Sequence, residues 1–114
     1  MDSDKIVIIP TYNEKENIEN IIRAIRALKE NYHILIVDDG SPDGTAQIVK
    51  ALQQSEFSHS LFILERVGKQ GLGTAYISGF NWSLTHKYKY IFEMDADFSH
   101  DPNDLPRLYH ACLN

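Results

Sequence analysis

The sequence predicts an α/β fold in which a parallel sheet is covered by helices on both faces. Short β-branched or apolar runs alternate with segments of helical periodicity, turn-forming residues separate them, and the alternation continues through the chain. Such a series of βαβ units gives a Rossmann-like parallel sheet. With 114 residues, 43% of them hydrophobic and 24% charged, residues 1–114 are expected to form one globular domain.

The first unit of the alternation occupies the N-terminal part of the chain. Lys5–Ile9 is a short β-branched run that Pro10 ends, and it is the first predicted strand. Over Glu14–Glu30 the apolar residues recur at steps of three and four, which predicts a helix with one buried face. Asn13 followed by Glu16 fits a capping box that would open this helix.

The remaining elements repeat this alternation. They are a strand at His33–Val37, a turn-rich stretch at 40–44, a helix that carries Ile48, Val49 and Leu52, a strand at Leu61–Leu64, a helix at about Leu72–Thr85, a strand at Tyr90–Met94 and a helix from about Asn103. The last helix reaches Asn114 without a capping signal, and a four-stranded open sheet normally continues. We therefore expect the fold to be truncated on its C-terminal side.

Composition excludes several classes of protein. A net charge of −5 argues against nucleic acid as a partner, because phosphate binding needs clustered Lys and Arg. The longest apolar run, Ile6–Pro10, is far shorter than the ~20 residues that cross a bilayer, and no leader precedes it. A soluble, cytoplasmic location is therefore expected. The single cysteine, Cys112, cannot form an internal disulfide, and we predict that it packs in the interior.

Polar clusters follow each predicted strand. In open α/β sheets, ligands bind outside the carboxyl ends of the strands, at the point where the strand order reverses. The clusters here lie at 10–14, 38–41, 66–73 and 95–97. We expect these four loops to converge on one crevice.

Asp95 and Asp97 are the candidate metal ligands. Two carboxylates directly after an apolar strand repel each other unless a cation lies between them. Mg²⁺ or Mn²⁺ suits such a site, because these ions keep coordination positions for water and for a diphosphate. The alternative is a pair of solvated aspartates, with Asp97 or Asp101 capping the last helix. His100 is predicted to be a bystander rather than an acid–base group.

Asp38 and Asp39 repeat this arrangement after the second strand. A carboxylate in that position can accept hydrogen bonds from ribose hydroxyls or a base edge. The alternative is turn chemistry, because the stretch 38–44 is rich in turn-forming residues.

The glycine-bearing segment 68–74 is similar to a phosphate-binding loop but matches neither the dinucleotide fingerprint nor the P-loop spacing. In one interpretation, Gly71 and Gly73 only allow close packing of a helix. In the other, Arg66 and Lys69 offset the negative charge of a bound nucleotide sugar.

Taken together, four ordered motifs resemble glycosyltransferase family 2, and among its members the polyprenyl-phosphate (dolichyl-phosphate) mannosyltransferases. The motifs are Pro-Thr-Tyr-Asn-Glu at 10–14, Val-Asp-Asp-Gly-Ser-Pro-Asp-Gly-Thr at 37–45, Gly-Lys-Gln-Gly-Leu-Gly-Thr-Ala-Tyr at 68–76 and Met-Asp-Ala-Asp-Phe-Ser-His-Asp-Pro at 94–102. The resemblance covers nearly the whole chain and implies a GT-A type nucleotide-diphospho-sugar transferase fold.

The resemblance also implies roles for individual residues. Asp95 and Asp97 would hold the catalytic Mg²⁺ or Mn²⁺ on the sugar-nucleotide diphosphate, and Ser99 is a candidate third ligand at a position where some relatives have Gln. The candidate residues for binding the donor nucleotide are Pro10, Tyr12, Glu14, Val37, Asp38, Asp39, Lys69 and Ala96.

The implied reaction is transfer of mannose from GDP-mannose to a polyprenyl phosphate, with inversion, at the cytoplasmic face of a membrane. A phosphomonoester is already anionic near neutral pH, with a second pKa of about 6, so its oxygen can attack without a general base. The family's acceptor-binding and membrane-facing portion has no counterpart before Asn114. One alternative is a UDP-sugar-dependent enzyme of the same family, and another is a non-catalytic nucleotide-binding domain. An exposed apolar edge would favour homo-oligomers.

Overall fold

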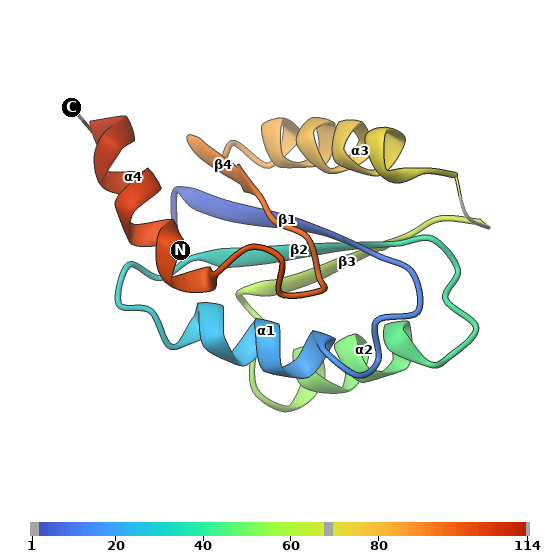
Figure 1. The fold of residues 1–114 in the computed structure, drawn as a ribbon. Helices are drawn as coiled ribbons and strands as arrows, with labels where there is room; N and C mark the ends of the chain where they lie inside the picture. The colour runs from blue at the N-terminus through green and yellow to red at the C-terminus, as the bar shows by residue number, and fades with distance from the viewer. Residues whose placement is uncertain (1–2, 68–69, 114) are drawn as a thin grey trace.

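The computed structural model describes residues 3–67 and 70–113 of the chain. Strands and helices alternate along it, as Figure 1 shows. The elements are β1 (Lys5–Thr11), α1 (Ile18–Arg26), β2 (His33–Asp38), α2 (Thr45–Ser55), β3 (Leu61–Glu65), α3 (Leu72–Thr85), β4 (Tyr90–Glu93), a 3₁₀ turn η1 (Pro102–Asp104) and α4 (Leu105–Leu113). The predicted α/β class and every predicted strand are confirmed.

The four strands form one parallel sheet in the order β3-β2-β1-β4. Helices α1 and α2 cover one face and α3 covers the other (Figure 1). Strand β1 lies in the middle, and all seven of its residues are buried. The chain moves outward from β1 to β3 and then returns to the other side of β1, so the strand order reverses between β1 and β4. That point is where such sheets bind ligands.

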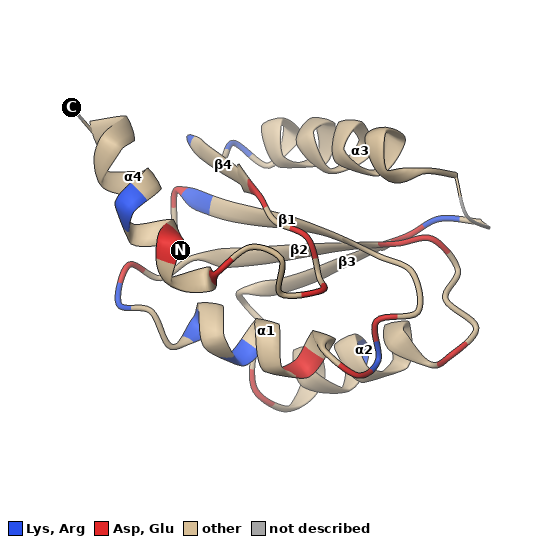
Figure 2. Ribbon diagram, in the orientation of Figure 1, with Lys and Arg blue, Asp and Glu red and all other residues tan. Residues whose placement is uncertain are grey.

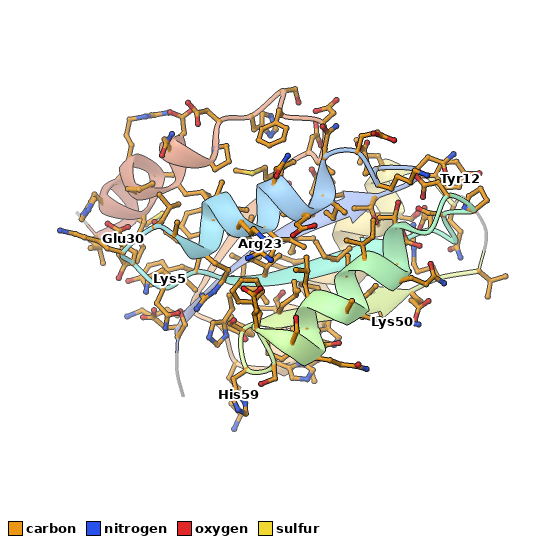
Figure 3. All side chains as sticks on the ribbon, turned by 90° about the horizontal axis from the view of Figure 1, so that it is seen from below. Lys5, Tyr12, Arg23, Glu30, Lys50 and His59 are labelled. Atoms are coloured by element: carbon orange, nitrogen blue, oxygen red, sulfur yellow. The ribbon has the colours of Figure 1, made fainter. Side chains whose placement is uncertain are left out.

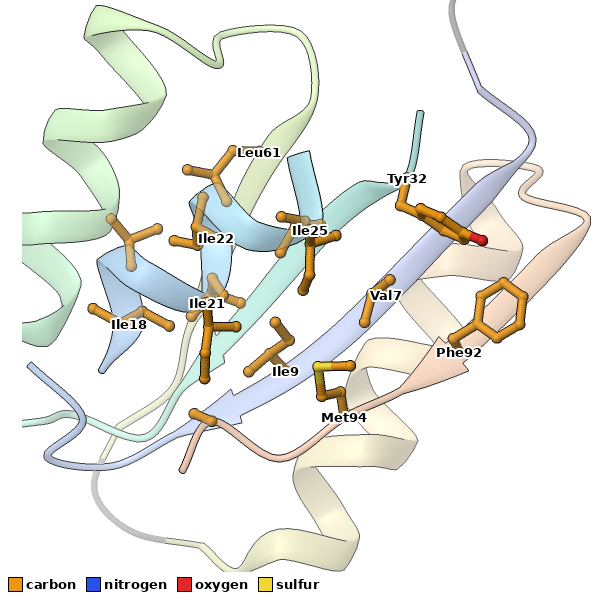
Figure 4. Packing of buried hydrophobic residues seen from close by; sticks show 14 of the residues in the cluster. Val7, Ile9, Ile18, Ile21, Ile22, Ile25, Tyr32, Leu61, Phe92 and Met94 are labelled. Atoms are coloured by element: carbon orange, nitrogen blue, oxygen red, sulfur yellow. The ribbon is translucent and has the colours of Figure 1, made fainter. Parts of the chain in front are cut away.

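Alternate residues of β1 belong to two hydrophobic clusters. Val7 and Ile9 pack with the α1 and α2 side, whereas Ile6 and Ile8 pack with the α3 side. Alternation arises because successive side chains of a strand point to opposite faces of the sheet. In α1 the spacing of three and four residues instead places Ile18, Ile21, Ile22 and Ile25 on one face, which is buried against the sheet (Figure 4). Burying one such isoleucine contributes about 1.5–3 kcal/mol, so the spacing selects which face of the helix points inward.

Helix α1 is shorter than the predicted Glu14–Glu30, and the predicted capping box at Asn13 is wrong. Asn13 adopts a positive φ of 57°, and the helix begins at Ile18 without a side-chain cap. The reason is that the neighbouring loop binds the backbone here. The Asn13 amide donates to Ser41 Oγ at 2.9 Å, and the Glu14 amide donates to Thr45 Oγ1 at 3.0 Å. These tertiary bonds replace the local cap and hold the chain after β1 against the chain after β2.

The C-terminal helix begins at a 3₁₀ turn. Asp101 accepts a hydrogen bond from the Asn103 amide at 2.9 Å, so the capping role considered for Asp101 is confirmed. The prediction that Cys112 packs in the interior is wrong, because Cys112 is exposed. It lies in the last turn of α4, which extends away from the sheet in Figure 1, so no other element covers it.

Among the described residues, no helix combines the length and the apolar character that a bilayer crossing requires.

Candidate functional site

A pocket of about 240 Å³ opens at the carboxyl ends of the strands. It receives residues from the loops after β1, β2 and β4 and from the start of α3, so the predicted convergence on one crevice is confirmed. The lining residues are Pro10, Thr11, Tyr12, Glu14, Asp39, Gly71, Leu72, Ala75, Asp95, Ala96 and Asp97. In Figure 3, Tyr12 lies at this end of the molecule, and Lys5 and Glu30 lie at the opposite end.

Most of the predicted site residues line this pocket. They are Pro10, Tyr12, Glu14, Asp39, Asp95, Ala96 and Asp97. Val37, Asp38 and Ser99 are absent from its walls, and Lys69 lies outside the described residues.

Asp38 stabilises the loop rather than facing the pocket. Its side chain is buried, and its carboxylate accepts from Thr11 Oγ1 at 2.7 Å and from Ser41 Oγ at 2.6 Å. The Ser41 amide also donates to it at 3.0 Å. Val37 is likewise fully buried, in the cluster beneath α3. The structure therefore places the side chains of Val37 and Asp38 in the framework of the site, where Asp38 orients the pocket residue Thr11.

Asp39 faces the pocket and forms a buried ion pair. Arg66 Nε and Nη2 donate to its two carboxylate oxygens at 2.6 and 2.9 Å, and the Gln70 amide donates at 3.1 Å. Burial alone would raise the pKa of Asp39, but the Arg66 and backbone hydrogen bonds outweigh it and lower that pKa below its usual value. Arg66 also donates to the Gly71 carbonyl at 3.2 Å. The pair thus joins the end of β2 to the loop before α3.

Asp95 is held from two directions. The Tyr76 hydroxyl donates to Asp95 Oδ1 at 2.8 Å, and the Asp95 amide donates to His100 Nδ1 at 3.2 Å. Burial, followed by the hydrogen bond to Asp95, raises the pKa of Tyr76, so the phenol keeps its proton. His100 is exposed, and its hydrogen bond to Asp95 is with the backbone amide rather than with the carboxylate.

Asp97 is held within its own loop. The Ser99 hydroxyl and amide both donate to its carboxylate, the amide at 2.9 Å, and they lower the pKa of Asp97. Between these two residues, Phe98 adopts a positive φ of 63°, an uncommon conformation for a bulky side chain. Ser99 therefore supports Asp97, and its predicted role as a third metal ligand stays a prediction.

The pocket carries an excess of negative charge. Four carboxylates line it, from Glu14, Asp39, Asp95 and Asp97, and acidic positions gather around these loops in Figure 2. Among the described residues, only Asp39 of these four forms a salt bridge with a lysine or arginine. No three acidic, histidine or cysteine side chains of the described residues group closely enough to hold a metal by themselves. An oxygen-liganded divalent cation fits this donor set if a substrate diphosphate completes its coordination.

Gly71 and Gly73 do not have the close-packing role that the sequence suggested for them. Gly71 has a φ of 102°, which a residue with a side chain rarely adopts, and it leads into α3. A Cβ added at Gly71 or Gly73 would meet nothing within 4 Å, so neither glycine serves close packing. Gly79 does so instead, because a Cβ there would lie 2.6 Å from Ile8 Cγ2.

Four functional positions were not among the individually predicted site residues, although two of them, Thr11 and Leu72, lie in the clusters predicted to converge on the crevice. Thr11, Leu72 and Ala75 line the pocket, and Tyr76 holds Asp95. The spacing of Leu72 and Ala75 on the first turn of the predicted helix was a usable signal, since that turn follows the glycine loop into the crevice. No local pattern indicates that Tyr76 reaches a loop 19 residues later.

The four-stranded sheet and its helices have the fold of GT-A type glycosyltransferases. The mannosyltransferase PcManGT from Pyrobaculum calidifontis, solved in complex with GDP-Man and Mn²⁺, superposes with a TM-score of 0.64 at 23% identity; the match covers 72% of this chain and 26% of that protein. Residues 1–349 of TarS from S. aureus, solved with UDP-GlcNAc, give a TM-score of 0.60 at 26% identity, covering 82% of this chain and 26% of that one.

The chain belongs to glycosyl transferase family 2, whose family model matches residues 6–113. It is 45% identical over 106 residues to a polyprenol monophosphomannose synthase of Mycolicibacterium smegmatis. It is also 43% identical, over the same length, to an undecaprenyl-phosphate mannosyltransferase of Micrococcus luteus. Each match covers 93% of this chain, but only 40% and 43% of the two relatives.

Proposed function

We propose that this chain binds the sugar-nucleotide donor of a polyprenyl-phosphate mannosyltransferase, with GDP-mannose as the donor. The observation that carries the proposal is the acidic cleft itself, which gathers Asp39, Asp95 and Asp97 at the strand switch point. The sequence similarity to a polyprenol monophosphomannose synthase and an undecaprenyl-phosphate mannosyltransferase supports the proposal. The Pyrobaculum protein with GDP-Man and Mn²⁺ adds a precedent for the same donor on the same fold.

We assign different roles to the residues of the cleft according to their chemistry. Tyr12 and Asp39 line the cleft and would bind the nucleoside. Arg66 fixes the ionised Asp39 carboxylate, which can then accept hydrogen bonds from ribose hydroxyls. Asp95 and Asp97 would hold Mg²⁺ or Mn²⁺, which neutralises charge on the departing diphosphate. The acceptor would be a polyprenyl phosphate, whose oxygen is anionic and needs no general base. Positioning and electrostatics would then carry the transfer, at the cytoplasmic face of a membrane.

Two alternatives predict different ligands or no reaction. The TarS structure with UDP-GlcNAc supports a UDP-sugar donor on this fold. A non-catalytic nucleotide-binding domain would bind a donor without turnover. Donor preference tests the first alternative, and assay of a chain as long as the relatives tests the second.

The proposal is tested by calorimetric titration of the chain with GDP-mannose, GDP, UDP-glucose and UDP, each with and without Mn²⁺. We expect guanine nucleotides to bind most tightly, in a manganese-dependent way. Asp95→Ala and Asp97→Ala should abolish that dependence, because each removes one of two carboxylate ligands. Asp104→Ala is the matched control, since Asp104 is absent from the cleft walls. A uridine preference would overturn the choice of donor, and equal binding with and without Mn²⁺ would overturn the metal site.

A further inference from the structure

Tyr76 is the one side chain of α3 whose hydroxyl reaches the carboxylate of Asp95. The hydroxyl donates to Asp95 Oδ1 at 2.8 Å, while the ring packs against the cluster beneath α3. We infer that Tyr76 is a positioning residue, which fixes the Asp95 carboxylate for a divalent cation and couples it to the start of α3. This inference rests on the proposed function, because it assumes a cation at Asp95.

The two candidate metal ligands are supported differently. Asp97 is held by Ser99, two residues away in the same loop. Such a local contact moves with the loop and cannot set its place relative to the sheet. The contact to Asp95 instead comes from a separate helix, 19 residues away in the chain. It therefore restrains Asp95 relative to the body of the protein.

The hydrogen bond also determines which part of Asp95 is available. A neutral phenol donates one proton, here to Oδ1, and among the described residues no hydrogen bond to Oδ2 is seen, so Oδ2 keeps both lone pairs for a cation. Groups that bind the outer oxygen of a metal-binding carboxylate orient it, and removing them commonly lowers metal affinity roughly 10–100-fold. Loss of the Tyr76 hydroxyl would allow the Asp95 carboxylate to rotate away from that orientation.

The same contact links the cation to the other end of the cleft. The first turn of α3 contributes Leu72 and Ala75 to the pocket wall, Gly71 directly precedes this turn and also lines the pocket, and Tyr76 follows Ala75. An α-helix is stiff over this distance, so a shift of its first turn moves the Tyr76 hydroxyl as well. Cation binding and donor binding would therefore be coupled through α3, beyond the direct contact of the cation with the diphosphate.

The test compares Tyr76→Phe with Tyr88→Phe, a matched control. The Tyr88 hydroxyl also makes one side-chain hydrogen bond, to His33 Nδ1 at 2.7 Å, and its ring packs on the same cluster. Tyr88 does not line the cleft. Each variant removes one hydroxyl and keeps the ring, so a general loss of stability should be similar in the two. Thermal unfolding by circular dichroism measures that loss.

Mn²⁺ affinity is measured from the electron paramagnetic resonance signal of free Mn²⁺ during titration at saturating GDP. We expect Tyr76→Phe to weaken Mn²⁺ binding at least tenfold, Tyr88→Phe to leave it unchanged, and GDP affinity without metal to be equal in all three proteins. Equal Mn²⁺ affinity in the two variants would overturn the inference and leave the proposed function standing. Absence of Mn²⁺ binding to the unmodified chain would overturn both.

Discussion

The ion pair of Asp39 and Arg66 lies almost entirely out of water, with side-chain exposures of 7% and 9%. Removing one partner of such a pair leaves an uncompensated buried charge. We therefore expect Arg66→Met to lower the free energy of unfolding by about 3 kcal/mol. Arg23→Met should cost much less, because Arg23 makes a comparable double contact to Glu56 on the exposed surface. Urea denaturation at pH 7 measures both losses.

The same ion pair predicts a pH dependence. Because the pKa of Asp39 is lowered, its contribution to stability is present above the ordinary Asp pKa of about 3.9 and is lost as the pH falls through the folded value. The difference in stability between the unmodified protein and Arg66→Met should therefore shrink when denaturation is repeated in that acid range. A difference that stays constant down to pH 3 would contradict the assigned ion pair.

At the scale of residues, the sequence predicted both Asp38 and Asp39 as nucleotide-binding residues, but only Asp39 lines the pocket. Asp38 and Asp39 are adjacent in a turn-rich loop, and no local pattern distinguishes them. The structure separates them because Thr11 and Ser41 surround Asp38, whereas Arg66 reaches Asp39 from 27 residues away. Which carboxylate faces the cleft is thus decided by tertiary partners, which residue spacing alone does not reveal.

At the scale of elements, α3 contains two glycines with opposite surroundings. A Cβ at Gly79 would lie 2.6 Å from Ile8 Cγ2 and 3.3 Å from Val37 Cγ2, whereas one at Gly73 would meet nothing within 4 Å. Gly79→Ala should therefore lose about 2 kcal/mol, because the helix must move off the sheet. Gly73→Ala should gain about 0.5 kcal/mol from reduced freedom of the unfolded chain. Thermal and urea unfolding of both variants test this contrast, and a loss of equal size in both would contradict it.

The start of α1 shows why element boundaries were harder to predict than the elements. The periodicity of its isoleucines identified the helix and its buried face correctly, because both depend on spacing within the segment. The capping box failed because the Asn13 amide binds Ser41 in the loop after β2 and the Glu14 amide binds Thr45 at the start of α2. Local propensity decides a helix end only where no tertiary donor or acceptor competes with it.

At the scale of the whole molecule, the order of strands and helices was predictable because each βαβ unit is nearly local. A right-handed crossover from one parallel strand to the next leaves few ways to arrange three such units. The side of β1 on which β4 lies was not predictable in this way, because it depends on pairing between β1 and β4, which lie far apart in the sequence. The cleft arises from that placement, which brings Asp95 beside residues of β1.

The two faces of the sheet are covered unequally, which bears on the expected homo-oligomer. Helix α3 covers its face alone and contains no charged residue, as its uniform colour in Figure 2 shows. Ile77, Phe80 and Leu84 recur at helical spacing on its outer side, with 63%, 44% and 52% of their surfaces exposed. We name these three residues the α3 stripe. An uncharged apolar stripe on an exposed helix favours association with another apolar surface.

We therefore expect the protein to self-associate through the α3 stripe as its concentration rises. Ile77→Lys should lower the weight-average sedimentation coefficient at high concentration, because it places a charge within the stripe at its most exposed residue. Gln54→Lys is the matched control, since it adds the same charge at an exposed position of α2 on the opposite face of the sheet. Sedimentation velocity over a hundredfold range of concentration distinguishes the outcomes. A protein that remains monomeric throughout would contradict self-association, and equal effects of the two lysines would show that net charge, rather than the α3 stripe, controls it.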